Sequence, residues 1–173
     1  MDDAATINAP SYFNHLRFAT YYSDLVIPEA QETGIHPLLL FSIIRQESFF
    51  ESFAFSPAGA SGLMQFMSAT GQERANLLGW PPDYRQTDLL RPVVSITFGA
   101  DYLSNLLEYL DGDIFAALAG YNGGPGNSKI WKDLSNGDQD LFLEIVRFEE
   151  TRRYITTIYE VFTIYRRLYS RTP

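Results

Sequence analysis

One carboxylate, Glu47, has sequence neighbours that could tune it for acid–base chemistry. Apolar side chains flank it and leave it few polar neighbours: Leu38, Leu39, Phe41, Ile43, Ile44, Phe49 and Phe50. An ionised carboxylate there would be poorly solvated, and near the C-terminal end of a helix it would face the negative end of the helix dipole. Both effects raise the pKa of a carboxyl group, as a general acid at neutral pH requires. The helix pattern alone favours a plainer alternative, a solvated glutamate at a helix end, paired with Arg45 or a distant base.

Few other residues suit a familiar catalytic centre. The two histidines, His15 and His36, have no second ligand at helical spacing, and the chain has no cysteine. Neither a metal site nor a disulfide is therefore expected, and no cofactor is predicted. The glycines of residues 123–126 follow no strand, so they make a weak candidate for a phosphate-binding loop. These glycines could end a helix or take part in binding, and the sequence favours neither role over the other.

Composition limits the remaining possibilities. With 173 residues, of which 46% are hydrophobic, the chain can form one compact domain with a real core. A net charge of -8 argues against a nucleic-acid partner. The aromatic share of 15% could serve a core or stack against sugars. The start of the chain lacks a basic region followed by an apolar run, so no signal peptide is expected in it, and no apolar stretch approaches the length of a membrane span.

Helical spacing of apolar residues runs through most of the chain, and few stretches alternate with the period of two. A helical pattern begins at Tyr12, and Pro28 is expected to interrupt this pattern. Gly34 is expected to end the short helix that precedes Gly34. Pro37 should open the helix that carries Glu47. Further helices are expected from about Ser68 or Thr70 with a capping box, and over 92–110, 114–121, a short piece through 130–131, 141–145 and 149–169. The sequence thus predicts one all-α domain over residues 11–173 after a flexible lead-in over residues 1–10.

Four short motifs then give the chain a family resemblance. They are Arg45-Gln46-Glu47-Ser48, the stretch from Ser56 to Met67 (SPAGASGLMQFM), the stretch from Gly120 to Gly126 (GYNGGPG), and Glu150-Thr151-Arg152-Arg153-Tyr154. In this order and spacing they resemble the soluble lytic transglycosylases of bacterial cell walls, over roughly residues 20–168. Two positions depart from the family pattern. Gly123 stands where alanine is common, which should loosen the loop, and Arg147 stands where proline is common.

The resemblance implies a lysozyme-like, goose-type helical fold with a substrate groove and roles for eight residues. Glu47 matches the catalytic acid/base, and seven further positions match residues that line the groove: Ser56, Gln65, Met67, Tyr121, Asn122, Glu144 and Tyr154. Glu144 would be a second acidic residue in the cleft, and Tyr154 a tyrosine close to Glu47. Structural alternatives exist for three of them, because Met67 could be core, Tyr154 a helix-packing residue and Glu144 solvent-facing near a helix cap.

The resemblance also implies a reaction. Glu47 would donate a proton to the β-1,4 glycosidic oxygen between N-acetylmuramic acid and N-acetylglucosamine. It would then take one from the C6 hydroxyl, whose attack on C1 leaves a 1,6-anhydro end. The implied partner is the peptidoglycan glycan strand, and the implied location is extracytoplasmic. Three alternatives remain: a goose-type lysozyme-like hydrolase with Glu144 as the suspect second carboxylate, a non-catalytic glycan-binding module, and a helical interaction module.

Overall fold

The helix that carries Glu47, α4 (Pro37–Ser48), buries most of its residues and packs against α10 (Glu149–Tyr169) and α3 (Ser23–Thr33). The imidazole of His36 caps its start, where Nδ1 accepts a hydrogen bond from the Leu38 amide at 3.2 Å, and Pro37 occupies the first helical position. The helix ends at Phe49, whose φ of 50° is left-handed and whose amide donates to the Arg45 carbonyl. Glu47 therefore lies in the last turn of a buried helix.

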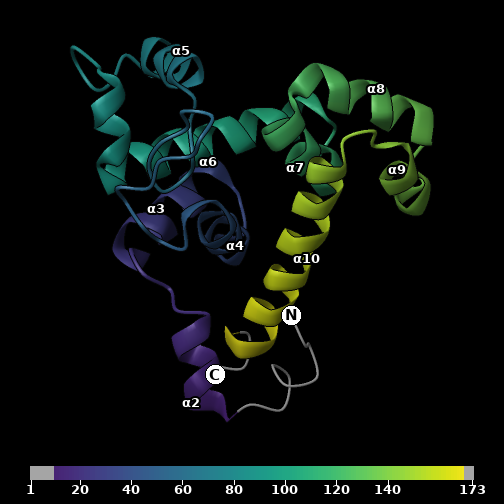
Figure 1. The fold of residues 1–173 in the computed structure, drawn as a ribbon, viewed down its shortest axis with the longest axis horizontal. Helices are drawn as coiled ribbons and strands as arrows, with labels where there is room; N and C mark the ends of the chain where they lie inside the picture. Colours follow the sequence, from purple (N-terminus) through teal and green to yellow (C-terminus); the bar gives the residue numbers. More distant parts are fainter. Residues whose placement is uncertain (1–9, 170–173) are drawn as a thin grey trace.

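The computed structural model describes residues 10–169, and its regular elements are helices (Figure 1). Besides the three helices above they are α2 (Ser11–Arg17), α5 (Ser68–Leu78), the short 3-10 helix η1 (Gln86–Leu90), α6 (Pro92–Tyr109), α7 (Ile114–Gly123), α8 (Pro125–Ser135) and α9 (Gln139–Ile145). Extended pairing in this part of the chain is limited to the isolated bridges Phe55–Ser61 and Ser61–Phe66. The all-α, lysozyme-like prediction is confirmed. None of the helices within residues 10–169 combines the length and apolar character needed to cross a membrane.

The loop between α4 and α5 is pressed onto α6 by close backbone contacts. Gly99 has no side chain, so Met64 packs against it where a Cβ atom would lie 2.3 Å from the Met64 methyl group. The Ser95 hydroxyl accepts a hydrogen bond from the Met64 amide at 3.0 Å. Gly62 has a φ of 82° and approaches the backbone of Leu89, where any side chain would collide. These contacts fix the segment that carries Gln65.

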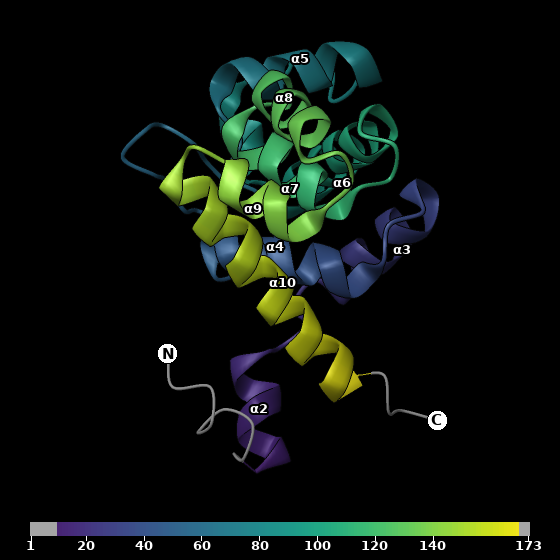
Figure 2. The ribbon, with the colours of Figure 1, turned by 90° about the vertical axis from the view of Figure 1, so that its right-hand side faces the viewer.

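The long helix α10 packs against two other helices of the core, α4 and α7. Its buried residues recur at helical spacing, among them Tyr154, Ile155, Ile158 and Tyr165. Its first turns pack against α7 and its length crosses α4, while α2 lies near its far end (Figures 1 and 2). α4, α7 and α10 therefore meet around the end of α4 that bears Glu47.

The structure corrects four local predictions. Pro28 lies inside α3 and does not interrupt it; burial of Val26 and Ala30 holds the helix together although proline removes one backbone donor. The pattern that begins at Tyr12 breaks after Arg17, and Tyr22, with a φ of 59°, precedes the next helix.

The other two corrections concern helix starts. Backbone geometry at Met67 begins α5 without a side-chain cap, so the predicted capping box does not form. Asp138 caps α9 by accepting from the Leu141 amide at 3.0 Å, so this helix begins at Gln139, before the predicted start at residue 141. Of the predicted lead-in over residues 1–10, only Pro10 belongs to the described residues.

Candidate active site

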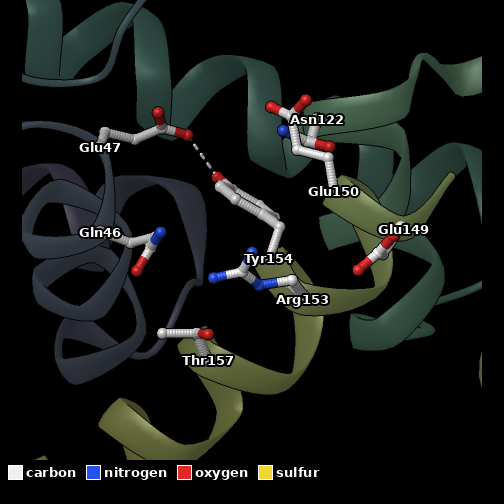
Figure 3. Close-up of a pocket in the computed structure, with 8 residues that line it drawn as sticks. All are labelled: Gln46, Glu47, Asn122, Glu149, Glu150, Arg153, Tyr154 and Thr157. Carbon is white, nitrogen blue, oxygen red and sulfur yellow. Dashed lines mark hydrogen bonds between the residues drawn. The ribbon is translucent and has the colours of Figure 1, made fainter. Parts of the chain in front are cut away.

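Three helices supply the walls of a pocket of about 600 Å³ around Glu47 (Figure 3). α4 contributes Gln46 and Glu47, and α7 contributes Asn122. The remaining lining residues come from the first turns of α10: Glu149, Glu150, Arg153, Tyr154 and Thr157. All eight are polar, so the pocket can hold a ligand rich in hydroxyl and amide groups.

The carboxyl group of Glu47 accepts a hydrogen bond from the Tyr154 hydroxyl at 2.5 Å (Figure 3). Burial raises the pKa of this carboxyl group from 4.5 to about 7. The hydrogen bond from Tyr154 opposes that rise, and the negative charge of Glu150 adds to it. A carboxyl group with a pKa of about 7 can both donate and accept a proton near neutral pH. The sequence predicted a raised pKa from apolar neighbours, and burial is indeed its main cause.

Two tyrosines hold their hydroxyl protons beside this carboxyl group. The rings of Tyr121 and Tyr154 are stacked, with centroids 6.5 Å apart and an angle of 9° between planes. Burial, with the nearby charge of Glu47, raises the pKa of both phenols well above 10. Tyr154 donates to Glu47, while Tyr121 donates to the Met64 carbonyl at 2.9 Å and so ties α7 to the Gln65 loop. Tyr154 thus contacts Glu47 directly, whereas Tyr121 packs against the Tyr154 ring and bonds to the Met64 backbone.

Asn122 is oriented by α10. The Thr151 hydroxyl donates to the Asn122 side-chain oxygen at 2.6 Å, which leaves the amide nitrogen to face the pocket as a donor. Asn122 lies in the last turn of α7, which Gly124, with a φ of 90°, and Pro125 bring to an end. The Gly123–Gly126 segment therefore ends α7, which is one of its two predicted roles, and it directly follows Asn122. A Cβ atom on Gly123 would lie 3.0 Å from the Thr151 hydroxyl, so this glycine allows close packing.

A second pocket, of about 510 Å³, continues from Glu47 on the side of the α4–α5 loop and includes Ser56 and Gln65. The Gln65 amide nitrogen donates to the carbonyls of Gly62 at 2.8 Å and Ala54 at 3.3 Å, which leaves its side-chain oxygen as an acceptor. The Ser56 hydroxyl accepts from the Ala60 amide at 3.0 Å and keeps its own proton to donate. Both predicted residues therefore lie in one pocket with Glu47.

Met67 and Glu144 lie farther from the carboxyl group. Met67 is 46% exposed and lines a small hollow of about 80 Å³ with Gln65 and Tyr121, so it is a rim residue and not part of the core. Glu144 is exposed on α9 and is absent from the residues that line either pocket containing Glu47. The acidic residues that share the first pocket with Glu47 are Glu149 and Glu150.

Several pocket residues escaped the sequence analysis, although a signal existed for some. Glu150 lies four residues before Tyr154, so the two share a helix face, and a tyrosine directed at Glu47 brings Glu150 with it. Thr157 and Arg153 are four residues apart on α10, and both line the pocket.

Within residues 10–169, no group of three or more histidine, cysteine, aspartate or glutamate side chains could hold a metal ion.

Comparisons with known proteins show the family of the chain. The family model described as "Transglycosylase SLT domain" matches residues 24–141. The soluble lytic murein transglycosylases of Salmonella typhimurium and Escherichia coli K12 are 35% and 33% identical to the chain, over 94% of its length. The chain spans only about a quarter (26%) of each of these relatives.

Solved structures give the same result. The 70 kDa soluble lytic transglycosylase of Escherichia coli superposes with a TM-score of 0.83 and 33% identity, over 95% of this chain and 27% of that one. An inactive mutant of the lytic transglycosylase Slt from Pseudomonas aeruginosa superposes with a TM-score of 0.78 and 35% identity, over 88% of this chain and 25% of that one. The chain therefore belongs to the transglycosylase SLT domain family.

Proposed function

We propose that residues 11–173 form the catalytic domain of a peptidoglycan lytic transglycosylase that acts outside the cytoplasm, where peptidoglycan lies. The domain would cleave the β-1,4 bond between N-acetylmuramic acid and N-acetylglucosamine and leave 1,6-anhydro ends. One observation carries this proposal: the half-buried Glu47, whose carboxyl pKa is raised to about 7 and which faces a polar pocket. The names of the relatives, lytic murein transglycosylases, support the same reaction.

Glu47 would act first as an acid and then as a base. Its proton passes to the glycosidic oxygen as the bond to C1 breaks. The carboxylate then takes the proton of the C6 hydroxyl, whose oxygen attacks C1 of the same sugar. Because this nucleophile belongs to the substrate, it has the advantage of an intramolecular reaction and no water is consumed. The Tyr154 hydroxyl at 2.5 Å stabilises the carboxylate after the first transfer, and its raised pKa keeps its own proton in place.

Polar groups around Glu47 would hold the sugars. The amide nitrogen of Asn122 offers a donor on one side, and the side-chain oxygen of Gln65 offers an acceptor on the other. The Ser56 hydroxyl adds a donor. N-acetyl and hydroxyl groups of a glycan can pair with all three. Fixed donors and acceptors on both sides of the acid would align the scissile bond with it.

A hydrolase is the second candidate, and Glu150 is the observation that favours it. Hydrolytic glycosidases commonly use two carboxyl groups, one of them as base or nucleophile. Glu150 shares the pocket with Glu47 and influences its pKa. In this version Glu150, which lines the pocket, would activate a water molecule in place of Glu144, which does not line it.

Mass analysis of muropeptides released from purified peptidoglycan separates the two reactions. The lytic transglycosylase produces anhydro-muramic ends, which are lighter by one water than the reducing ends of a hydrolase. We expect anhydro ends only. Reducing ends would reject the transglycosylase and assign the hydrolase, and the absence of any released fragment would reject both enzymes in favour of a glycan-binding module. Peptidoglycan incubated without protein is the control.

A further inference from the structure

Three phenylalanines stand exposed beside Glu47: Phe49, Phe53 and Phe55, here called the aromatic rim. They are 65%, 73% and 64% accessible to solvent. Single exposed apolar residues are common on proteins, but a cluster of large ones in one hollow usually marks a binding surface. All three line the pocket of about 510 Å³ that also contains Glu47. The aromatic rim is therefore continuous with the site of the proposed reaction.

The ring of Phe49 and the backbone of the aromatic rim are held in place before any ligand arrives. The guanidinium of Arg45 lies 5.2 Å from the ring centre of Phe49 and itself bonds to the Arg17 carbonyl. Phe55 pairs with Ser61 in an isolated bridge. Between Phe53 and Phe55, the Ala54 carbonyl accepts from the Gly62 amide at 3.0 Å and from Gln65 at 3.3 Å. A backbone that is preset in this way lowers the ordering cost of binding.

The chemistry of the surrounding pocket selects the kind of ligand. The lining residues of this pocket include no lysine or arginine, and they include two acidic residues, Glu47 and Glu51. An anionic lipid headgroup is therefore disfavoured. Beside the rings stand a free acceptor on Gln65 and a hydroxyl donor on Ser56. A neutral ring with one apolar face and hydrogen-bonding groups on its edge matches this combination.

We propose that the aromatic rim is a stacking subsite for an N-acetylhexosamine ring of the glycan strand, next to the sugar held at Glu47. The C–H face of that sugar lies on Phe53 or Phe55, and its hydroxyl or acetamido groups reach Gln65 and Ser56. This inference rests on the proposed function, since it extends the same groove by one sugar on the side of the α4–α5 loop. In Figure 2 this connection, drawn in blue, projects from the body of the molecule.

Oligomers of N-acetylglucosamine with defined length test the subsite. Binding is measured by calorimetry with the Glu47→Gln chain, so that no oligomer is cleaved, and the Phe53→Ala/Phe55→Ala changes are added to it. We expect the hexamer to bind about tenfold more weakly, as loss of an aromatic contact implies, and the dimer to be much less affected. Phe53→Tyr/Phe55→Tyr should restore affinity because the ring faces return, whereas Phe53→Leu/Phe55→Leu should not. Phe13→Ala is the matched control, a 55% exposed phenylalanine on α2 that does not line this pocket.

The outcomes separate this inference from the proposed function. Equal hexamer binding with and without the two rings overturns the subsite, as does full affinity in the leucine variant, which would indicate a general apolar surface. Binding of the unmodified chain to vesicles of phosphatidylglycerol and phosphatidylethanolamine that depends on Phe53 and Phe55 would assign the aromatic rim to a membrane instead. If the rings govern hexamer binding but the unmodified chain releases no muropeptides, the subsite stands and the proposed reaction fails. Cleavage that coexists with unchanged hexamer binding gives the reverse result.

Discussion

Two pockets have the same volume, about 600 Å³ each, but differ in the residues that line them. The pocket at Glu47 draws its walls from α4, α7 and α10, and the bond between Tyr154 and Glu47 joins residues 107 positions apart. The other pocket, beside α5, is built from one stretch of chain: Gln72, Ala75, Asn76, Gly79, Pro81, Pro82, Asp83, Tyr84 and Arg85.

Each pocket contains a carboxylate and a tyrosine, but of these two pairs only Tyr154 and Glu47 are joined by a hydrogen bond. In the α5 pocket Asp83 is exposed on a turn with a φ of 54°. The Tyr84 hydroxyl approaches Gly71 and, among residues 10–169, has no hydrogen-bond partner. In the Glu47 pocket the glutamate is half-buried, burial raises the pKa of its carboxyl group, and Tyr154 donates a hydrogen bond to it. Volume alone therefore does not identify a site; a desolvated acid with an oriented donor does.

The carboxylates give the largest expected contrast. Glu47→Gln keeps the shape of the side chain but removes the proton donor, so activity on purified peptidoglycan should fall on the order of a thousandfold. Asp83→Asn changes the other pocket in the same way, and asparagine tolerates the left-handed backbone there, so activity should stay at the level of the unmodified chain. Release of soluble muropeptides over time measures both. Near-normal activity of the Glu47→Gln chain would remove the basis for treating the two pockets differently.

The tyrosines give a smaller contrast. Tyr154→Phe leaves the carboxylate without its donor, and we expect kcat/KM to fall roughly tenfold. Because the Tyr154 hydrogen bond lowers the pKa of Glu47, its loss raises that pKa. The alkaline limb of the pH profile, which requires protonated Glu47, should therefore move to higher pH. Initial rates measured on both sides of neutral pH reveal the shift.

The matched change in the α5 pocket is Tyr84→Phe. It removes a buried hydroxyl that has no partner among the described residues, so thermal stability should be equal or higher and activity unchanged. A comparable loss of activity in the Tyr84→Phe chain would show that the tyrosine effect is not specific to the Glu47 pocket.

Much of the fold could be predicted from the sequence because local signals and packing agreed. The helix over Glu149–Tyr169 was predicted with its bounds, and Pro37 and Ile114 begin α4 and α7 as expected. The errors arose where tertiary contacts overrode local preference. Pro28 is accommodated inside α3 by burial of its neighbours, a gain that no local rule contains.

The candidate site was predictable only in part. Glu47 could be singled out because its apolar neighbours imply burial, and burial is the main cause of its shifted pKa. Glu149, Glu150 and Arg153 were missed because the direction in which α10 faces α4 depends on long-range packing. The family resemblance implied that Glu144 is the second acidic residue of the cleft. In the structure Glu144 is exposed on α9 and does not line the pocket, whereas Glu150 does.

Glu150 gives the smallest expected effect. It concerns the Glu47 pocket alone, because Asp83 has no second acidic residue beside it among the residues that line the α5 pocket. Its negative charge raises the pKa of Glu47, so Glu150→Gln should lower that pKa and move the alkaline limb to lower pH, opposite to Tyr154→Phe. Glu150 is exposed, and water screens its charge, so the rate at the optimal pH should change less than about fivefold. Glu149→Gln, one residue away on the same pocket wall, is the matched control and should leave the limb in place. A loss at every pH as large as that of Glu47→Gln would mean that Glu150 takes part in the chemistry itself, and the two-carboxylate hydrolase would then describe this pocket better than a single acid does.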